Sequence, residues 1–194
     1  MTYMTVTQAK AYIGGTSGDN DDALLALLIT NAETFIEGYT NRNFEATIGT
    51  ALVASNRTFG MQDVVDDMLI LDRDLCAIVS VTNGDSDVLT TSEYVTVPAN
   101  DTPYYAIKLR KFSNLYWTYT DDPEDEIIIN GSWGYSETPP ADILQATYDI
   151  VKTVYRSRDS NTDAGRTFIS GGVIITPAEV PKMTLLTLNR YRRA

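Results

Sequence analysis

Hydrophobic and polar positions change their spacing twice along the chain, near residue 44 and again near residue 136. Before the first change and after the second, apolar residues recur at three- and four-residue steps, which predicts amphipathic helices. Between the two changes, short β-branched runs alternate with turn clusters, which predicts strands. The pattern therefore indicates an α+β fold, in which a helical bundle built from both ends of the chain carries an inserted β subdomain.

The first helical segment contains two predicted helices. Thr5 and Gln8 have the spacing of a capping box, so a short helix is expected over residues 5–13. A longer helix is expected over residues 21–39, because acidic residues suited to capping begin it and Asn41 is a typical stop. Its predicted apolar face consists of Leu24, Leu25, Leu28, Ala32, Phe35, Ile36 and Tyr39.

The middle segment is predicted to be an antiparallel β-sandwich or a small barrel-like subdomain, because its strands and turns are short and regularly spaced. The candidate strands are residues 51–59, 68–71, 77–82, 94–97, 104–111 and 126–133. In the third of these, simple alternation would place Val79 and Val81 on one side of the sheet. Ile78, Ser80 and Thr82 would then lie on the other side.

The last segment returns to helical spacing. Pro139 and Pro140 suit the first turn of a helix, which is expected to reach about Arg158. Its predicted apolar face consists of Ile143, Ala146, Thr147, Ile150, Val151, Val154 and Tyr155. Residues 159–172 are polar and glycine-rich, which predicts a loop or hinge. A Leu-rich helix is then expected to start near residues 176–179 and to end in a basic turn.

Charge limits the classes of partner. The 194 residues include 26 acidic and 15 basic ones, giving a formal net charge of −11. This charge repels DNA phosphates and anionic membranes, so neither specific DNA binding nor a membrane partner is expected. A single cysteine, Cys76, indicates a reducing compartment and is interpreted as a small buried residue. The chain also has no apolar run of membrane-spanning length and no secretory signal at its start.

Composition also argues against catalysis. The chain has no histidine, which excludes Ser-His-Asp and Cys-His sites and histidine-ligated metals. A carboxylate pair for glycoside hydrolysis, Asp66 or Asp67 with Glu93, remains open. Residues 19–22 and 121–126 are rich in oxygen ligands but lack the spacing of a calcium loop, so helix capping and a solvated turn explain them better. We therefore expect a non-enzymatic protein without metal or cofactor.

Four stretches in order along the chain resemble the head–tail connector (adaptor) proteins of tailed bacteriophages. The first is residues 5–13 (TVTQAKAYI) with residues 21–25 (DDALL) and 36–42 (IEGYTNR), and the second is residues 127–135 (IIINGSWGY) followed by two prolines and an apolar helix. The third is residues 154–159 (VYRSRD), and the fourth is residues 176–181 (TPAEVP) with the Leu-rich helix behind them. The order of the four carries the resemblance more than any single stretch does.

The resemblance implies a structural virion protein, a subunit of a homo-oligomeric ring beneath the portal that extends the DNA channel and joins head to tail. The implied partners are the portal protein, the tail or next neck protein, and other copies of the chain in a dodecamer. DNA would pass through without specific binding. The implied location is the virion neck, after assembly in the host bacterial cytoplasm.

The implied domains are residues 1–43 as the first bundle helices, 44–136 as the β insert, and 137–194 as the last helices with a hinge and a portal-docking tail. The portal-docking candidates are Leu185, Leu188, Arg190, Tyr191, Arg192 and Arg193. The hinge candidates are Gly171 and Gly172. The three arginines are equally compatible with plain capping of the last helical carbonyls.

A second hypothesis is a virion-associated β-sandwich that binds another protein or a glycan. It depends on an aromatic run in the β insert, whose interface candidates are Phe112, Tyr116, Trp117 and Tyr119. Four aromatic residues so close together form either an exposed binding patch or a strand end with half of them buried. The sequence leaves both possibilities open.

Overall fold

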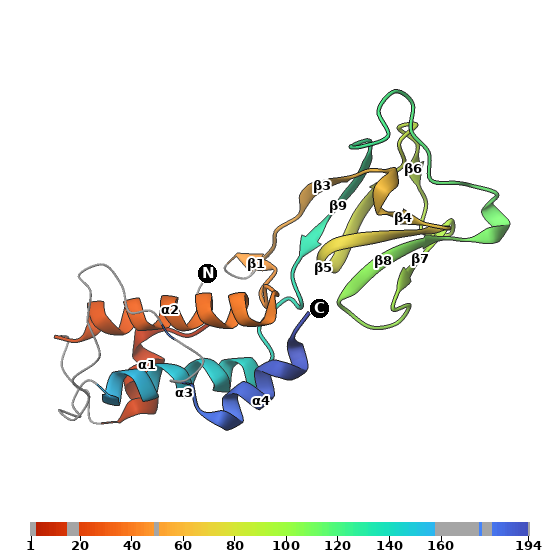
Figure 1. Ribbon diagram of the computed structural model, residues 1–194. Helices are drawn as coiled ribbons and strands as arrows, with labels where there is room; N and C mark the ends of the chain where they lie inside the picture. Colours follow the sequence, from red (N-terminus) through yellow and green to blue (C-terminus); the bar gives the residue numbers. More distant parts are fainter. Residues whose placement is uncertain (1–2, 15–19, 49–50, 158–174, 176–179, 194) are drawn as a thin grey trace. The chain divides into compact units, whose positions relative to one another are not determined.

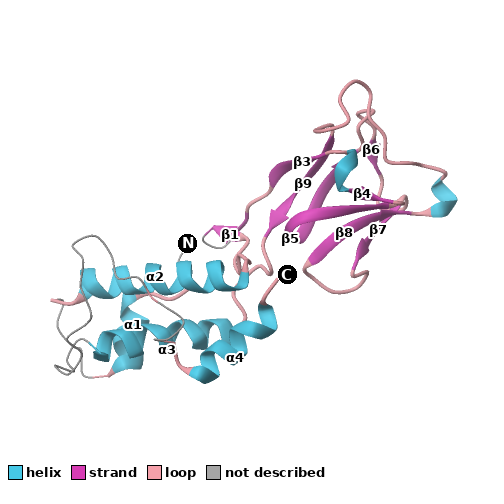
Figure 2. Cartoon of the chain, viewed as in Figure 1, coloured by secondary structure: helices cyan, strands magenta, loops and turns pink. Residues whose placement is uncertain are grey.

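The computed structural model describes residues 3–14, 20–48, 51–157, 175 and 180–193 of the chain (Figure 1). The chain divides into two compact units: Met1–Arg42 with Pro139–Ala194, called the helical unit here, and Asn43–Thr138, called the β unit. Among the described residues, α-helices occur only in the first unit and strands only in the second, which also has two short 3₁₀ turns (Figure 2). This combination confirms the predicted α+β class.

The described part of the helical unit contains four α-helices. They are α1 (Val6–Ile13), α2 (Asp22–Thr40), α3 (Ala141–Ser157) and α4 (Lys182–Tyr191). The capping box that begins α1 is present as predicted: the Thr5 hydroxyl accepts the backbone N–H of Gln8, and the Gln8 side chain accepts that of Thr5. Asn41 ends α2 in the left-handed conformation, at φ 53°, which Asn tolerates better than most residues.

The helical core follows the predicted periodicity closely in α3 and less closely in α2. All seven residues of the predicted α3 face are buried. The buried face of α2 consists of Leu25, Leu28, Ile29, Ala32, Glu33, Ile36 and Thr40. Leu24, Phe35 and Tyr39 are only half-buried. The face of α2 is thus rotated from the predicted one, and it includes a carboxyl group.

Two expectations about helix starts are modified. Asp21 occupies the N-cap position of α2 but makes no capping hydrogen bond; its carboxylate accepts the Tyr155 hydroxyl at 2.6 Å instead. Helix α4 begins at Lys182 with Pro181 as its N-cap. The expected start at residues 176–179 and the expected loop with Gly171 and Gly172 lie outside the described residues.

Within the described residues, the β unit forms a seven-stranded antiparallel sheet and a separate small hairpin. The hairpin is β1 (Thr47–Ile48) with β2 (Ala51–Leu52). The sheet contains β3 (Ser55–Phe59), β4 (Val64–Val65), β5 (Met68–Thr82), β6 (Val88–Leu89), β7 (Tyr94–Val97), β8 (Tyr104–Leu109) and β9 (Ile127–Trp133). Its order is β3-β9-β5-β8-β7, with β4 and β6 also paired to β5. No pairing in the described part joins β3 to β7, so the sheet is open and the barrel-like prediction is wrong.

Strand β5 is longer than predicted and pairs with strands on both of its sides. The two strands predicted at residues 68–71 and 77–82 are one 15-residue strand, which pairs with β8 in its first half and with β9 mainly in its second. The register shifts between Ile78 and Ser80. Such an irregularity breaks simple alternation: Ile78 and Val81 both face the core, whereas Val79 is 66% exposed. The predicted pairing of Val79 with Val81 on one face is therefore wrong.

The β unit has one hydrophobic core cluster. It consists of Phe59, Leu69, Leu71, Leu75, Val81, Leu89, Tyr94, Ile107, Leu109, Trp117, Ile127 and Ile129. Gly131 of β9 lies so close to β5 that a Cβ atom there would be 2.5 Å from the Ala77 carbonyl oxygen. The two ends of the unit are hydrogen-bonded to each other, since the N–H of Tyr135 donates to the Asn43 carbonyl at 2.7 Å and that of Ala46 to the Ser136 carbonyl at 3.0 Å.

Candidate interaction surfaces

The C-terminal candidates do not form one surface. Leu188 is fully buried in the helical unit, and Leu185 is half-buried. The Tyr191 hydroxyl donates to the Asp142 carboxylate, with oxygen–oxygen distances of 2.7 and 2.8 Å. The Tyr191 carbonyl accepts the Nε–H of Arg42 at 2.5 Å. These side chains are used to fix α4 to α2 and α3.

The residues after α4 are also fixed to α2. The Arg193 N–H donates to the Thr40 carbonyl at 2.8 Å, which satisfies one of the last carbonyls of α2. The guanidinium of Arg192 lies 5.8 Å from the ring centroid of Tyr39, whose hydroxyl donates to Asn189 at 2.7 Å. The described C-terminal segment is thus an integral part of the helical unit.

The outer face of α4 is a candidate that sequence reasoning missed. Met183 is 75% exposed and Leu186 59% exposed, and Arg190 is exposed beside them. Their three- and four-residue spacing places them on one face of the helix. The sequence does not show which face of α4 is exposed, because leucines occur on both faces: Leu186 is exposed and Leu188 is buried.

The aromatic run is divided between the surface and the core. Phe112 and Tyr116 are 72% and 80% exposed, and Tyr119 is 49% exposed. Trp117 is buried, and its indole N–H donates to the Asp67 carbonyl at 3.1 Å. Tyr119 belongs to another turn, where its backbone pairs with Gly84. The structure therefore leaves Phe112 and Tyr116 as the exposed aromatic pair.

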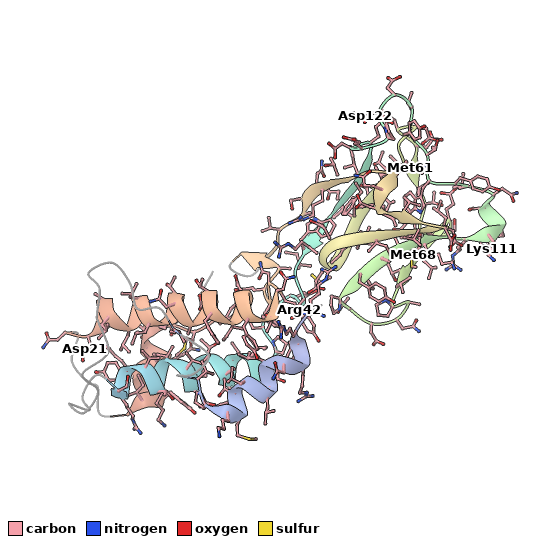
Figure 3. All side chains as sticks on the ribbon, in the orientation of Figure 1. Asp21, Arg42, Met61, Met68, Lys111 and Asp122 are labelled. Carbon is pink, nitrogen blue, oxygen red and sulfur yellow. The ribbon has the colours of Figure 1, made fainter. Side chains whose placement is uncertain are left out.

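These two residues lie in or next to a groove of about 640 Å³, called the basic groove here. Buried Leu109 and Trp117, with half-buried Leu115, form its apolar floor, and exposed Arg110, Lys111 and Tyr116 form its rim. The groove is also lined by Met61, Val64, Asp66, Asp67, Lys108 and Asn114. Lys108 is paired with Asp67 at 3.3 Å. Lys111 is labelled on the right-hand side of the β unit in Figure 3.

The carboxylate pair considered for catalysis is not assembled. Asp66 and Asp67 line the basic groove, whereas Glu93 does not. The Glu93 carboxylate instead accepts the backbone N–H and the hydroxyl of Thr90 at 2.6 and 2.9 Å, and these hydrogen bonds lower the pKa of Glu93. A carboxyl group that stays ionised is unsuited to donating a proton to a leaving group.

A second charged feature of the β unit is residues 121–125, called the acidic loop here. The Glu126 carboxylate closes it by accepting the N–H groups of Thr120, Asp121 and Asp122 at 2.5, 3.0 and 3.0 Å, which lowers the pKa of Glu126. The Pro123 carbonyl accepts the N–H of Met61 at 2.6 Å. The loop backbone is therefore held by the Glu126 carboxylate and by Met61, and residues 121–125 are exposed, as a solvated turn would be.

The remaining candidates have local structural roles. Cys76 is half-buried and not fully buried as interpreted from the sequence. Its thiol contacts the Ser132 carbonyl at 3.3 Å, and burial, followed by the charge of Glu137, raises the pKa of this thiol. No group of three or more potential metal-ligating side chains occurs in the described part of the chain. Nor do the described helices include one that is long and apolar enough to cross a bilayer.

The family model for head completion proteins matches residues 2–194. The chain belongs to the head completion protein family. This membership confirms the resemblance to head–tail connectors and identifies a structural protein of the head–tail connection. No curated protein sequence matches the chain.

Solved structures resemble the fold of this head completion protein. One is a chain in the neck of an empty gene transfer agent particle computed with C6 symmetry, with a TM-score of 0.57 and 14% identity. Another is a chain in the virion of a native gene transfer agent particle, with a TM-score of 0.52 and 16% identity. In each case the match covers 99% of this chain and 90% of the other. The likeness therefore extends over both units.

Proposed function

We propose that this head completion protein forms a ring in the virion neck, beneath the portal, that extends the DNA channel and joins the head to the tail. The family match over residues 2–194 carries the proposal, because it includes both compact units. The ring subunit acts by position and contact, without catalysis or a cofactor. Assembly takes place in the host bacterial cytoplasm.

The proposed oligomer is a dodecamer. A similar chain lies in a neck that was computed with C6 symmetry, and a dodecameric ring is compatible with that symmetry. The net charge of −11 supports a channel component that DNA passes without specific binding, since negative protein surfaces repel phosphates. The other proposed partners are the portal protein and the tail or next neck protein.

The outer face of α4 is our proposed portal-docking surface. Met183 and Leu186 expose apolar side chains there, and Arg190 adds a positive charge. Of the six C-terminal candidates, Arg190 is retained as a direct contact. Leu188 and Tyr191 are proposed to support the docking helix from inside, because their side chains are used within the helical unit. Hinge roles for Gly171 and Gly172 remain a proposal from the sequence.

Point variants test docking better than a truncation after Val180, which would remove α4 and with it the buried Leu188. Met183→Asp with Leu186→Asp should lower affinity for the portal at least about tenfold, as expected for losing apolar anchors from an interface. Leu27→Asp is the matched control, because Leu27 is a 40% exposed leucine on α2. Equal portal binding by both variants would contradict docking through α4.

Ring formation itself is tested by light scattering on the protein alone and mixed with its portal protein. A species of ring size in either sample is the expected result. Monomers of 21.5 kDa in both samples, with no complex, would contradict the connector function. The second candidate function, a virion binding module for protein or glycan, would then be favoured by the exposed Phe112 and Tyr116.

A further inference from the structure

The basic groove is unusual for so acidic a chain. Three of the 15 basic residues, Lys108, Arg110 and Lys111, lie along its wall. Lys108 is paired with Asp67, and Asp66 is the other acidic residue of the lining, which leaves an excess of one positive charge there. Among the described residues Lys111 has no ion-pair partner. Because Tyr116 lies beside these charges above an apolar floor, the groove suits an acidic segment that also buries apolar surface.

The acidic loop has the complementary charge. Asp121, Glu124 and Asp125 are exposed, and no ion pair to them occurs in the described part of the chain. Glu126 is occupied in holding the loop backbone, so the loop is already ordered before it meets a partner. An ordered loop loses less conformational entropy on docking than a flexible one does.

Within one copy the loop is held at the Met61 end of the groove, away from Lys111. Pro123 and Glu124 are fixed to Met61 and Gln62, through a backbone hydrogen bond of 2.6 Å and a side-chain hydrogen bond of 3.2 Å. Figure 3 shows Asp122 and Lys111 at separate corners of the β unit. Two complementary patches at different places on one subunit produce head-to-tail contacts, which close into rings when the rotation between copies allows it.

We propose that the acidic loop of one copy docks in the basic groove of the next, so that the β units form a head-to-tail contact around the ring. This inference rests on the proposed ring. The charges Arg110 and Lys111 select the loop and orient it, and Tyr116 packs over it. Contacts of this kind weaken as salt increases, because exposed charges are screened.

Charge reversal tests the contact. The groove variant carries Arg110→Glu and Lys111→Glu; the loop variant carries Asp121→Lys and Asp125→Lys, whose side chains make no hydrogen bond or ion pair within the described residues. Each variant alone should remain at the 21.5 kDa mass of one chain at concentrations where the wild type is a ring. Mixing the two should restore the ring, because each loop then meets a groove of opposite charge. A chain with all four changes should also assemble.

The assembly of the variants and of the wild type distinguishes failure of the loop–groove contact from failure of the proposed ring. If both reversal variants assemble as the wild type does, alone or with the portal protein, the loop–groove contact is wrong and the ring stands. If the wild type never assembles, alone or with the portal protein, the ring and this contact fall together. Far-UV circular dichroism checks that the variants are folded. If a reversal variant unfolds, the milder pair Lys111→Gln and Asp121→Asn should each raise the concentration for half-assembly about tenfold, and unchanged assembly would overturn the contact.

Discussion

The helical unit and the β unit expose hydrophobic residues in different ways. In the helical unit, exposed Met183 and Leu186 lie on the face of α4 opposite the buried Leu188, so a single short helix carries both core residues and the proposed contact residues. In the β unit, the most exposed aromatics, Phe112 and Tyr116, lie in the segment after β8 and outside the buried core cluster. Mutations should therefore separate stability from binding more cleanly in the β unit than in α4.

The largest effect is expected at Leu188. Replacing it with alanine removes a fully buried side chain and should lower the free energy of unfolding of the helical unit by about 2–5 kcal/mol. Leu186→Ala on the same helix is the control and should change it by less than about 0.5 kcal/mol. Urea unfolding followed by far-UV circular dichroism measures both. Similar losses from the two variants would contradict the division of α4 into an inner and an outer face.

The same glycine-to-alanine change should have opposite signs in the two units. Gly131→Ala should destabilise the β unit by about 1–3 kcal/mol, because the new Cβ would lie 2.5 Å from the Ala77 carbonyl oxygen. Gly38→Ala should stabilise α2 by about 0.5–1 kcal/mol, because nothing lies within 4 Å of that Cβ and alanine is the better helix former. Thermal unfolding of both variants tests the pair, and a stabilising Gly131→Ala would refute the tight packing of β9 on β5.

A pH effect is expected in the helical unit from Glu33. Burial raises the pKa of this carboxyl group from 4.5 to about 7, although the Tyr3 N–H donates to it at 2.5 Å. The folded state thus holds the proton more tightly than the unfolded chain, and the contribution of Glu33 to stability declines as pH rises from about 4.5 to 7. Glu33→Gln should be stabilising by on the order of 1–2 kcal/mol near pH 8 and nearly neutral near pH 4.5.

The control for this pH effect is Glu124→Gln, which removes an exposed carboxylate of the same type. Unfolding free energies from urea titrations at the two pH values give the comparison. A gain from Glu33→Gln that is equal at both pH values would show that ionisation of Glu33 is not its source.

The smallest effect is expected on the solvent face of the β unit. The Arg57 guanidinium pairs with Asp72 at 2.6 Å and lies 5.0 Å from the ring centroid of Trp133. Both members of the ion pair are substantially exposed, so Arg57→Ala should cost less than about 1 kcal/mol. Arg57→Lys keeps the charge and isolates the stacking on Trp133. A loss above about 2 kcal/mol in a urea titration would mean that this edge of the sheet depends on the pair.

The buried face of α3 could be predicted from the sequence, whereas the register of β5 could not. A helix buries residues according to its own spacing, so the face of α3 could be predicted residue by residue. A strand takes its register from its neighbours, and the shift at Ile78 and Ser80 arises from pairing with β9, which local alternation does not encode. The charged residues Asp72, Arg73 and Asp74 concealed the continuity of β5 for a similar reason: the partner of Asp72, for example, is Arg57 of β3.

The candidate sites were predictable as segments but not as side chains. The Leu-rich last helix and the aromatic turn were both found from the sequence. Sequence spacing could not assign Leu188 and Trp117 to the core. Burial of Leu188 depends on the packing of α4 against α2 and α3, and burial of Trp117 depends on the segment before β5 that contains Asp67. The groove that combines Met61, Lys108 and Tyr116 brings together residues far apart in the chain, which no local motif marks.

The paired ends of the β unit have an evolutionary consequence. Its incoming and outgoing chains are joined by hydrogen bonds from Tyr135 to Asn43 and from Ala46 to Ser136. Everything between these pairs is a cassette with its own core and with neighbouring entry and exit points. Exchange of such a cassette requires no change in the residues of the four described helices, because the cassette is one continuous stretch of the chain. A change within the β unit can therefore alter the contacts of this protein without altering the sequence of its helices.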